Sequence, residues 1–508
     1  MEENKTPSLL TAWLALFVVI IGTFMSVLDS SIVNIALPKM MSVFGMPVDD
    51  AKWILTCYTL TLGAIIPLTG YLQNIFGSKR IYIFSLATFT IGSFLCGFAW
   101  SGGTMIAFRV IQALGGGMIM PIGMSIIYQV FPREKIGLAL GYWGIAAMAA
   151  PTIGPTLGGF IIQSMDWRLI FYINVPIGIV GVVMAGIILK GEERKPFESF
   201  DVIGFLSCTI AIVSILYVLG EGSSIDWGDI KNPILMTLGC LSLVLFIVNE
   251  LTHPNPLLDL RILKLFDFTI SLIISSVLTL ALMGGSYILP LFLQSVRGYT
   301  AMQTGMIMLP SALVTGLFMP ISGNLFDKVG AKPLVIPGLL ILGIGSFQLA
   351  NAISMDSSQS NIVLITCIRS VGLGLAMMPI STAGMNAVSK ELVGGASALN
   401  NTVRQIASAL SVTIMSTLMT GRSNESYAKL AEQVTVYNKT AMDTISTLTK
   451  AFMRDGQSQS AAKVSAVSQL AKMIQGQATL DGMQYAVMVS VAIVVVAIIL
   501  TFFMRTRK

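Results

Sequence analysis

Long apolar runs separated by short polar connectors dominate the chain. Fourteen of these runs approach the length of about 20 residues that a helix needs to cross a bilayer. Six runs are followed by a charged connector, two further runs, a second polar connector and a last group of six. We expect spans at about 12–36, 52–72, 81–100, 104–128, 137–162, 169–190, 202–220, 233–250, 268–293, 304–324, 333–352, 361–384, 395–419 and 483–504. The predicted fold class is an all-α polytopic membrane protein.

Composition excludes other classes of protein. Of the 508 residues, 54% are hydrophobic and 11% are charged, and that charged share is less than half of the value usual in soluble domains. A soluble chain of this length could not bury so much apolar surface. A soluble enzyme, a nucleic-acid-binding module and a disordered protein are therefore excluded. The first run, Trp13–Ala36, is too long for a cleavable signal peptide and is interpreted as the first span.

The distribution of lysine and arginine predicts the orientation. With an inner N-terminus, the inner segments carry sixteen of these residues and the short outer connectors carry five. Positive residues concentrate on the cytoplasmic side of membrane proteins. This asymmetry and the even number of spans both place the two termini in the cytoplasm.

The sequence shows no catalytic or metal-binding pattern. The five cysteines lie singly in apolar runs, which is typical of small core residues rather than of disulfides or metal ligands. The one histidine, His253, lies in a polar connector. Neither a nucleophile–base signature nor a Gly-rich phosphate loop is present. We expect a protein that is not an enzyme, is not driven by ATP, and has no metal and no cofactor.

The two groups of six spans repeat each other. The stretch Gly70–Arg80 before the third span and the stretch Gly323–Lys332 before the eleventh share their glycines and a following cation. The fourth and twelfth spans carry Arg109 and Arg369, each followed by glycines and a proline. Repeated six-span halves with a substrate site between them are typical of transporters.

Several stretches resemble, in order, the motifs of one transporter family. They are Leu28–Pro38 in the first span, Trp53 and Tyr58 in the second, Gly70–Arg80 in the next loop, Arg109–Gly117 in the fourth span, Gly154–Gly159 in the fifth and Trp167–Pro176 at the start of the sixth. On these motifs the chain resembles the major facilitator superfamily, and within it the fourteen-span drug:proton antiporters of the EmrB/QacA type. The resemblance covers nearly the whole chain. It implies the major facilitator fold, with two six-helix bundles and two inserted helices.

The resemblance and the pattern of runs divide the chain into three parts. We expect an N-terminal bundle at 1–190, a linker with the inserted pair at 191–267 and a C-terminal bundle at 268–508. The last part contains a long polar outer loop at about 420–482, in which some apolar residues have helical spacing. We expect one or two amphipathic helices resting on the outer face there, or alternatively a docking surface or a lid over the exit. No function of the inserted pair follows from the sequence beyond filling a lateral face.

Two motifs imply moving parts. By resemblance, a gating loop comprises Gly70, Asn74, Gly77, Lys79 and Arg80, with Asp327 in the second half. The family usually has Asp where this chain has Asn74, which can cap a helix but carries no charge. An Asp at this position would accept charge-assisted bonds from nearby cations and close the inner gate, and Asn74 lacks this charge. The antiporter motif comprises Gly154, Pro155, Gly158 and Gly159, and its kink and close packing predict a bendable seam; plain helix packing is compatible with this.

Asp29 is the candidate proton-coupling residue. It is the only acid well inside a span of the first half, where a carboxylate is costly unless it is paired, hydrated or protonated. Burial opposes its charge and a nearby cation favours it. Arg109 lies at a similar depth by helical rise, and we hypothesise a pair that separates on protonation. The alternatives are a static helix–helix hydrogen bond for Asp29 and, for Arg109, a role in holding backbone carbonyls near Gln112.

The sequence specifies the substrate pocket poorly. The candidate liners are Met25, Asn34, Trp53, Tyr58, Gln112, Met148, Tyr287, Asn401 and Gln405. The thirty methionines suit a promiscuous surface, although methionine in membrane helices more often packs against lipid or core. Arg369 and Arg404 are rare intramembrane cations that either balance anionic substrates or brace carbonyls, and the sequence does not choose between these roles.

The leading hypothesis is a proton-coupled antiporter that exports amphipathic, cationic or neutral compounds across the cytoplasmic (inner) membrane of a bacterium. The alternatives are an exporter of lipids, lipid conjugates or a specific metabolite, and a membrane sensor or assembly partner, which would not need Asp29. The coupling ion is the proton. The expected partners are the bilayer and small amphipathic substrates, without nucleic acid. The loop at 420–482 offers a docking site for a periplasmic adaptor protein, and the chain is expected to be a monomer.

Overall fold

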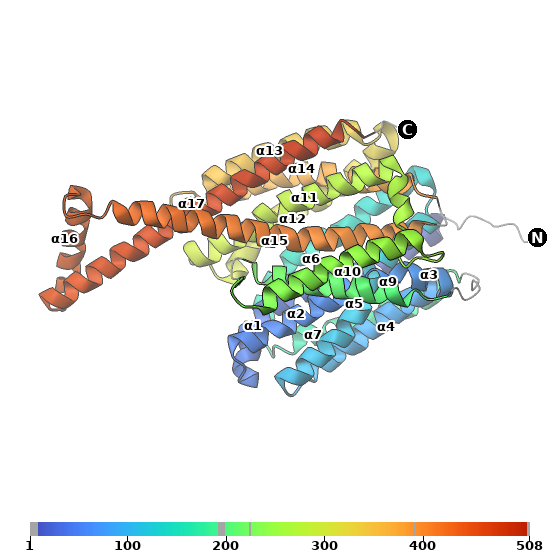
Figure 1. Ribbon diagram of the computed structural model, residues 1–508, viewed down its shortest axis with the longest axis horizontal. Coiled ribbons are helices and arrows are strands. Elements are labelled where there is room, and N and C mark those ends of the chain that lie inside the picture. The colour runs from blue at the N-terminus through green and yellow to red at the C-terminus, as the bar shows by residue number, and fades with distance from the viewer. Residues whose placement is uncertain (1–8, 192–198, 223–224, 390–391, 505–508) are drawn as a thin grey trace, which may run out of the picture.

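The structure is a computed structural model that describes residues 9–191, 199–222, 225–389 and 392–504. Its helices run side by side along one axis, and no strand occurs in these described ranges (Figure 1). The first helix begins and the last helix ends at the same end of the bundle (Figure 1), which is termed the termini end here; the opposite end is the far end.

Six spanning elements form the first half. They are α1 (Leu9–Phe44), the bent pair α2 (Val48–Ile65) and α3 (Leu68–Phe76), α4 (Ser78–Gly97), α5 (Gly102–Val130), α6 (Ile136–Ser164) after the 3-10 turn η1 (Arg133–Lys135), and the short α7 (Leu169–Tyr172) with α8 (Asn174–Ile188). The axes of α2 and α3 differ by 55°. Pro67 lies at this break, where its missing N–H interrupts the helical hydrogen bonds.

The inserted pair and the second half follow. The pair is α9 (Val202–Gly220) and α10 (Lys231–Thr252), and the 3-10 turn η3 (Leu260–Lys264) leads onward. The second half comprises α11 (Phe266–Leu291) with the π-turn η4 (Phe292–Val296), α12 (Ala301–Val329), α13 (Lys332–Ala352), α14 (Gln359–Asn386), α15 (Val393–Glu432), α16 (Lys439–Arg454) and α17 (Gln459–Thr501).

These helices account for the predicted spans. In the described ranges, twelve helices are long and apolar enough to cross a membrane, and the bent α2–α3 pair makes thirteen. The remaining predicted span is α15, which is less apolar than those helices. It packs against α17 and α11 in its own half and against α3 and α5 in the first. The predicted all-α, multi-span class is confirmed.

The polar segment at 420–482 differs from the prediction. α15 and α17 continue as helices beyond the bundle at the far end, and α16 lies at their tip (Figure 1). Ser426 Oγ donates a hydrogen bond of 2.5 Å to Asp481 Oδ2, which joins the two long helices. The prediction of amphipathic helices resting on the outer face is therefore wrong. The small residues Ala462 and Ala466 are buried in this extension, whereas Val464, Val467 and Met473 stay exposed.

The inserted pair bridges the two halves along one side. The rings of Trp53 on α2 and Tyr217 on α9 have centroids 5.7 Å apart. Thr413 on α15 donates a hydrogen bond of 2.6 Å to the carbonyl oxygen of Leu219 on α9. α9 thus contacts both halves and covers the seam between α2 and α15.

A second seam joins α6 to α12 along their length. Near the termini end, a methyl group added to Gly323 would overlap the backbone carbonyl of Gly137. Toward the far end, Gly305 packs against Thr156. Glycines allow the two backbones to approach this closely.

The halves also meet at the termini end. A Cβ on Gly70 would lie 3.2 Å from Cα of Gly395, so α3 and the start of α15 are in backbone contact. Ser397 Oγ on α15 donates a hydrogen bond of 2.8 Å to the carbonyl oxygen of Pro121 on α5. These contacts close the termini end between the two halves.

Candidate functional site

The structure brings Asp29 of α1 and Arg109 of α5 into direct contact. Nη1 of Arg109 lies 2.6 Å from Oδ2 of Asp29, and both side chains are at most 1% exposed. Each would be strongly unfavourable alone in an apolar interior. The pair satisfies the charge of both residues within the first half.

Gln112 closes a ring with this pair. It lies one turn after Arg109 on α5, which puts both side chains on one helix face. Its Nε2 donates to Oδ1 of Asp29 at 2.8 Å, and its Oε1 accepts from Nη1 of Arg109 at 2.7 Å. The three side chains therefore form a closed set of hydrogen bonds.

Asn174 and Ser93 extend the hydrogen-bond network of the Asp29 carboxylate to α8 and α4. Nδ2 of Asn174, at the start of α8, lies 3.0 Å from Oδ1 of Asp29 and 3.1 Å from Oγ of Ser93 on α4. Ser93 in turn donates to the carbonyl oxygen of Phe171 at 2.9 Å. Sequence reasoning missed both residues. Asn174 lies inside the matched motif Trp167–Pro176, and that position is the signal that could have identified it.

Tyr58 of α2 covers the other side of Arg109. The guanidinium carbon lies 3.8 Å from the centroid of the Tyr58 ring, which is a favourable cation–π geometry. Among the described residues, Nε of Arg109 and Oδ1 of Asn174 are buried without a hydrogen-bond partner. The Asp29 carboxylate is therefore fully hydrogen-bonded in this network, whereas one N–H donor of Arg109 and one amide oxygen of Asn174 have no partner in the described ranges.

Glycines bring α4 and α5 close enough to build this site. A Cβ on Gly92 of α4 would overlap Gln112, and one on Gly115 of α5 would overlap the backbone at Ser85. The contact between α4 and α5 therefore depends on the absence of side chains at these positions. It seats Gln112 beside the carboxylate.

The antiporter motif packs directly against the helix of Asp29. Gly154 faces Ser31, and Gly158 faces Ile32. Ser31 Oγ donates to the carbonyl oxygen of Pro151 at 2.9 Å. Pro155 lies within α6, and Gly159 faces Met302 of α12 across the seam. The motif thus links the α1 segment just after Asp29 to the contact between the halves.

The gating-loop residues lie at the termini end. Gly77 has φ of 81° and ends α3, a backbone conformation that favours glycine. Lys79 Nζ donates to the carbonyl oxygen of Gly186 at 2.6 Å, and Arg80 is exposed. Asn74 is also exposed and lines a small cavity with Leu392 and Gly395 beside the start of α15.

Asp327 occupies the related place in the second half. Its carboxylate accepts hydrogen bonds from the backbone N–H groups of Gly137 and Leu138, at the start of α6. A helix N-terminus favours a negative charge. The acid of the second-half motif therefore binds the first half, whereas Asn74 brings no charge to the start of α15.

The predicted pocket liners do not form one group. Met25, Tyr58 and Gln112 are buried within the first half, and the last two belong to the Arg109 network. Asn401 is buried and donates to the carbonyl oxygen of Ser397. The more accessible candidates are Asn34, Trp53, Met148, Tyr287 and Gln405, and Trp53 packs against the inserted pair.

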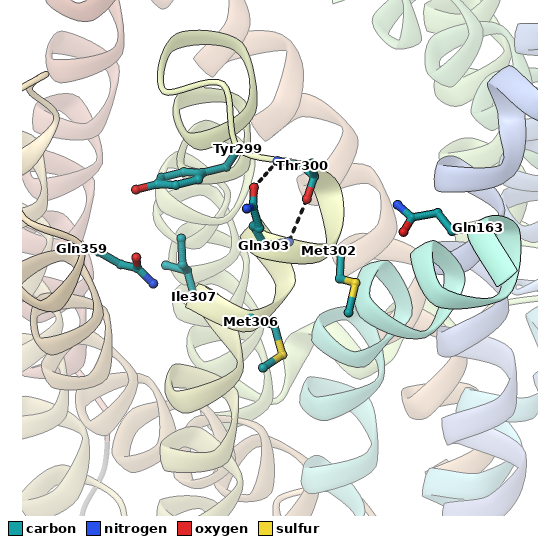
Figure 2. A pocket seen from close by; sticks show the side chains of 8 residues that line it. All are labelled: Gln163, Tyr299, Thr300, Met302, Gln303, Met306, Ile307 and Gln359. Atoms are coloured by element: carbon teal, nitrogen blue, oxygen red, sulfur yellow. Dashed lines mark hydrogen bonds between the residues drawn. The ribbon is translucent and has the colours of Figure 1, made fainter.

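Figure 2 shows a cavity of about 490 Å³ around the start of α12. Side chains from α6, from α12 and the turn before it, and from α14 surround it. They are Gln163, Tyr299, Thr300, Met302, Gln303, Met306, Ile307 and Gln359. Gln303 and Thr300 bond each other's backbone N–H groups, so they cap α12. Gln163 comes from the first half and the other residues from the second.

Comparison with known families gives one consistent result. The Major Facilitator Superfamily matches residues 19–412. The MFS-type transporter YhcA of Bacillus subtilis (strain 168) is 37% identical over 421 residues, which cover 82% of this chain and 78% of YhcA. The multidrug export protein EmrB of Escherichia coli (strain K12) is 31% identical over 423 residues, 83% of each chain.

Solved structures agree on the fold. The human organic anion transporter MFSD10 (TETRAN) aligns with a TM-score of 0.61 and 12% identity, over 96% of this chain and 99% of that chain. The proton:xylose symporter XylE aligns with a TM-score of 0.57 and 13% identity, over 97% of this chain and 96% of that chain. At these identities the likeness concerns the fold alone.

Proposed function

The chain belongs to the Major Facilitator Superfamily, and we propose that it is a proton-coupled antiporter that exports amphipathic drugs or toxic compounds by alternating access. The names of the relatives EmrB and the lincomycin resistance protein LmrB support drug export. The observation that carries proton coupling is the buried ion pair of Asp29 and Arg109.

The proposed coupling uses the charge balance of this pair. A proton arriving from outside neutralises Asp29, and Arg109 then loses its counter-charge. The guanidinium keeps its contacts with Gln112 and Tyr58, but its attraction to α1 falls. Because Ser31 and Ile32 of α1 pack against the antiporter motif of α6, a shift of α1 is transmitted to the seam between the halves.

We propose that the protein works in the cytoplasmic membrane of a bacterium with both termini in the cytoplasm. The excess of lysine and arginine in the inner segments supports this orientation. The termini end, which is closed in this structure, is then the cytoplasmic end. In a cell with two membranes, the extension formed by α15, α16 and α17 is the surface available to a periplasmic adaptor protein. The proton is the proposed coupling ion, and the protein acts as a monomer.

Transport in proteoliposomes tests this function. Movement of the cationic dye ethidium under an imposed pH gradient is compared between wild type and Asp29→Asn. We expect transport to require the gradient and to be lost in the variant. Asp166→Asn, which changes an exposed acid in the same way, is the matched control and is expected to behave as wild type.

Two outcomes would contradict the proposal. Gradient-driven transport that persists in Asp29→Asn would move the proton site elsewhere. If wild type moves no dye but moves a fluorescent lipid, the protein is a lipid exporter of the same fold.

A further inference from the structure

Two arginines lie within the spans of the second half, and the structure gives them different surroundings. Arg369 of α14 donates from Nε to Oγ of Ser346 at 3.1 Å and from Nη2 to the carbonyl oxygen of Leu282 at 3.0 Å. A methyl group on Gly285 would overlap its guanidinium, so α11 is shaped around this side chain. Arg369 therefore ties α13 and α14 to α11.

Arg404 of α15 has no comparable set of partners. Within the described residues its one hydrogen-bond contact runs from Nη2 to the thioether sulfur of Met120, at 3.9 Å, and a thioether is a weak acceptor. The ion pairs in the same ranges are those of Asp29 with Arg109 and of Glu425 with Arg422 and Lys429. Arg404 thus carries a charge that no described acid balances.

The guanidinium of Arg404 also reaches accessible space. The side chain is only partly buried, and none of its nitrogens is among the enclosed polar atoms that lack a partner in the described part of the chain. Its unused N–H groups therefore keep some accessible surface. Arg369 is buried to a similar degree, but two of its nitrogens are bonded to oxygen acceptors of the protein.

This charge lies at the middle depth of the bundle. Arg404 is roughly 16 Å along α15 from its first residue, and Met120 is roughly 15 Å along α5 from its last. The hydrocarbon core of a bilayer is about 30 Å thick, so both residues lie near its middle. The acids of α11 and α12 are Asp267 and Asp327, both near the termini end. An unpaired cation at mid-depth is costly, and an anion that reaches it is correspondingly stabilised.

We infer that Arg404 binds the anionic group of an amphipathic substrate, such as a carboxylate or sulfonate, between the two halves. The guanidinium offers a planar fork of N–H donors that matches the two oxygens of such a group. Met120 of the first half, which contacts the guanidinium, supplies a flexible apolar contact for the rest of the molecule. Met148 and Met377 pack as partly buried residues against the same hydrophobic core. This inference rests on the proposed function and adds amphipathic anions to the expected cationic or neutral substrates.

Two probes with one aromatic body and opposite charge test the inference. Dansylglycine carries a carboxylate and dansylcadaverine carries an amine. Both are followed in proteoliposomes under a pH gradient. We expect wild type to move dansylglycine, and Arg404→Gln to move it at least tenfold more slowly while the rate for dansylcadaverine changes less than twofold. Arg404→Lys, which keeps the charge, is expected to retain more dansylglycine transport than Arg404→Gln.

A second variant acts without removing Arg404. Met120→Glu places a carboxylate beside the guanidinium as an internal counter-ion and is expected to cause the same selective loss. If Arg404→Gln fails to fold, Met120→Glu decides the question. Arg422→Gln makes the same substitution on the same helix, but at an exposed ion pair, and is expected to leave both rates unchanged.

The outcomes separate this inference from the proposed function. Wild-type transport of dansylcadaverine without dansylglycine would overturn the role of Arg404 and leave antiport intact. Equal loss of both probes in folded Arg404→Gln and Met120→Glu, or no loss in either, would also overturn it. If neither probe nor ethidium moves under the gradient, the proposed function fails. Arg404-dependent movement of fluorescent phosphatidylglycerol in place of dansylglycine would support the anion site and assign it to a lipid headgroup.

Discussion

Nη1 of Arg109 and Oδ2 of Asp29 lie 2.6 Å apart in a site that excludes water from both side chains. The partners come from α1 and α5, so the bond also holds two helices of the first half together. A buried pair of this kind is far more sensitive to the loss of one partner than to the loss of both.

Arg109→Ala is therefore expected to destabilise the protein by about 3–5 kcal/mol, because it leaves the Asp29 carboxylate buried and unpaired. The double variant Asp29→Asn with Arg109→Gln is expected to recover most of this loss. Thermal unfolding in detergent measures both. The double variant should still lack gradient-driven transport, and a double variant no more stable than Arg109→Ala would contradict the charge argument.

Restoring an acid at position 74 is expected to strengthen closure of the termini end. Asn74 lies beside the start of α15, and a carboxylate near a helix N-terminus contributes about 0.3–1 kcal/mol. Asp327→Asn removes the corresponding charge from the start of α6 and is expected to act in the opposite sense.

Thiol labelling reports this closure. Ser397 is buried where α15 meets α5, so a Ser397→Cys reporter, in a background without the five native cysteines, reacts only when this end opens. Asn74→Asp should slow labelling about two- to fivefold, and Asp327→Asn should accelerate it. Equal rates in all three proteins would show that charge does not hold this end closed.

Glu250 gives a test of the connector after the inserted pair. It is fully buried at the end of α10, its Oε2 accepts from the backbone N–H of Leu258 at 3.0 Å, and its Oε1 has no partner among the described residues. A Cβ on Gly204 would touch this oxygen and also the carboxylate of Asp201. Two acids therefore lie side by side near the start of α9.

Glu250→Gln is expected to raise the midpoint of thermal unfolding, since an amide can donate to Asp201 and still accept from Leu258. Glu250→Ala leaves the Leu258 N–H buried and unpaired and is expected to cost about 1–3 kcal/mol. A lower midpoint for Glu250→Gln than for wild type would show that the negative charge itself is needed at this site.

The tip of the far-end extension is expected to be dispensable for transport itself. α16 packs on α17 and has no fully buried residue. Replacing Lys439–Arg454 with a short Gly-Ser linker should leave dye transport in proteoliposomes within twofold of wild type. Loss of drug resistance in intact cells with transport retained would support adaptor docking at this tip, whereas loss in both assays would assign the tip to the transport cycle.

Much of this architecture follows from the sequence because hydropathy and charge act locally. An apolar run long enough to cross a bilayer is more stable in the membrane than in water, whatever the rest of the chain does. The spans and the six–two–six grouping therefore follow from the sequence alone. Asp29 and Arg109 were identifiable for the same reason, since charged residues are rare in apolar spans and the two lie at similar depth. Asn174 and Ser93 were missed because polar uncharged residues are common in such spans.

Tertiary structure decided what each surface faces. The sequence determined that 420–482 has amphipathic helical stretches, but only packing showed that they extend α15 and α17 away from the bundle. It determined that Arg369 and Arg404 are intramembrane cations, but only the positions of Leu282, Ser346 and Met120 distinguished a braced side chain from an open one. A helical period shows which residues share a face, whereas the partner of that face depends on helices that lie far away in the chain.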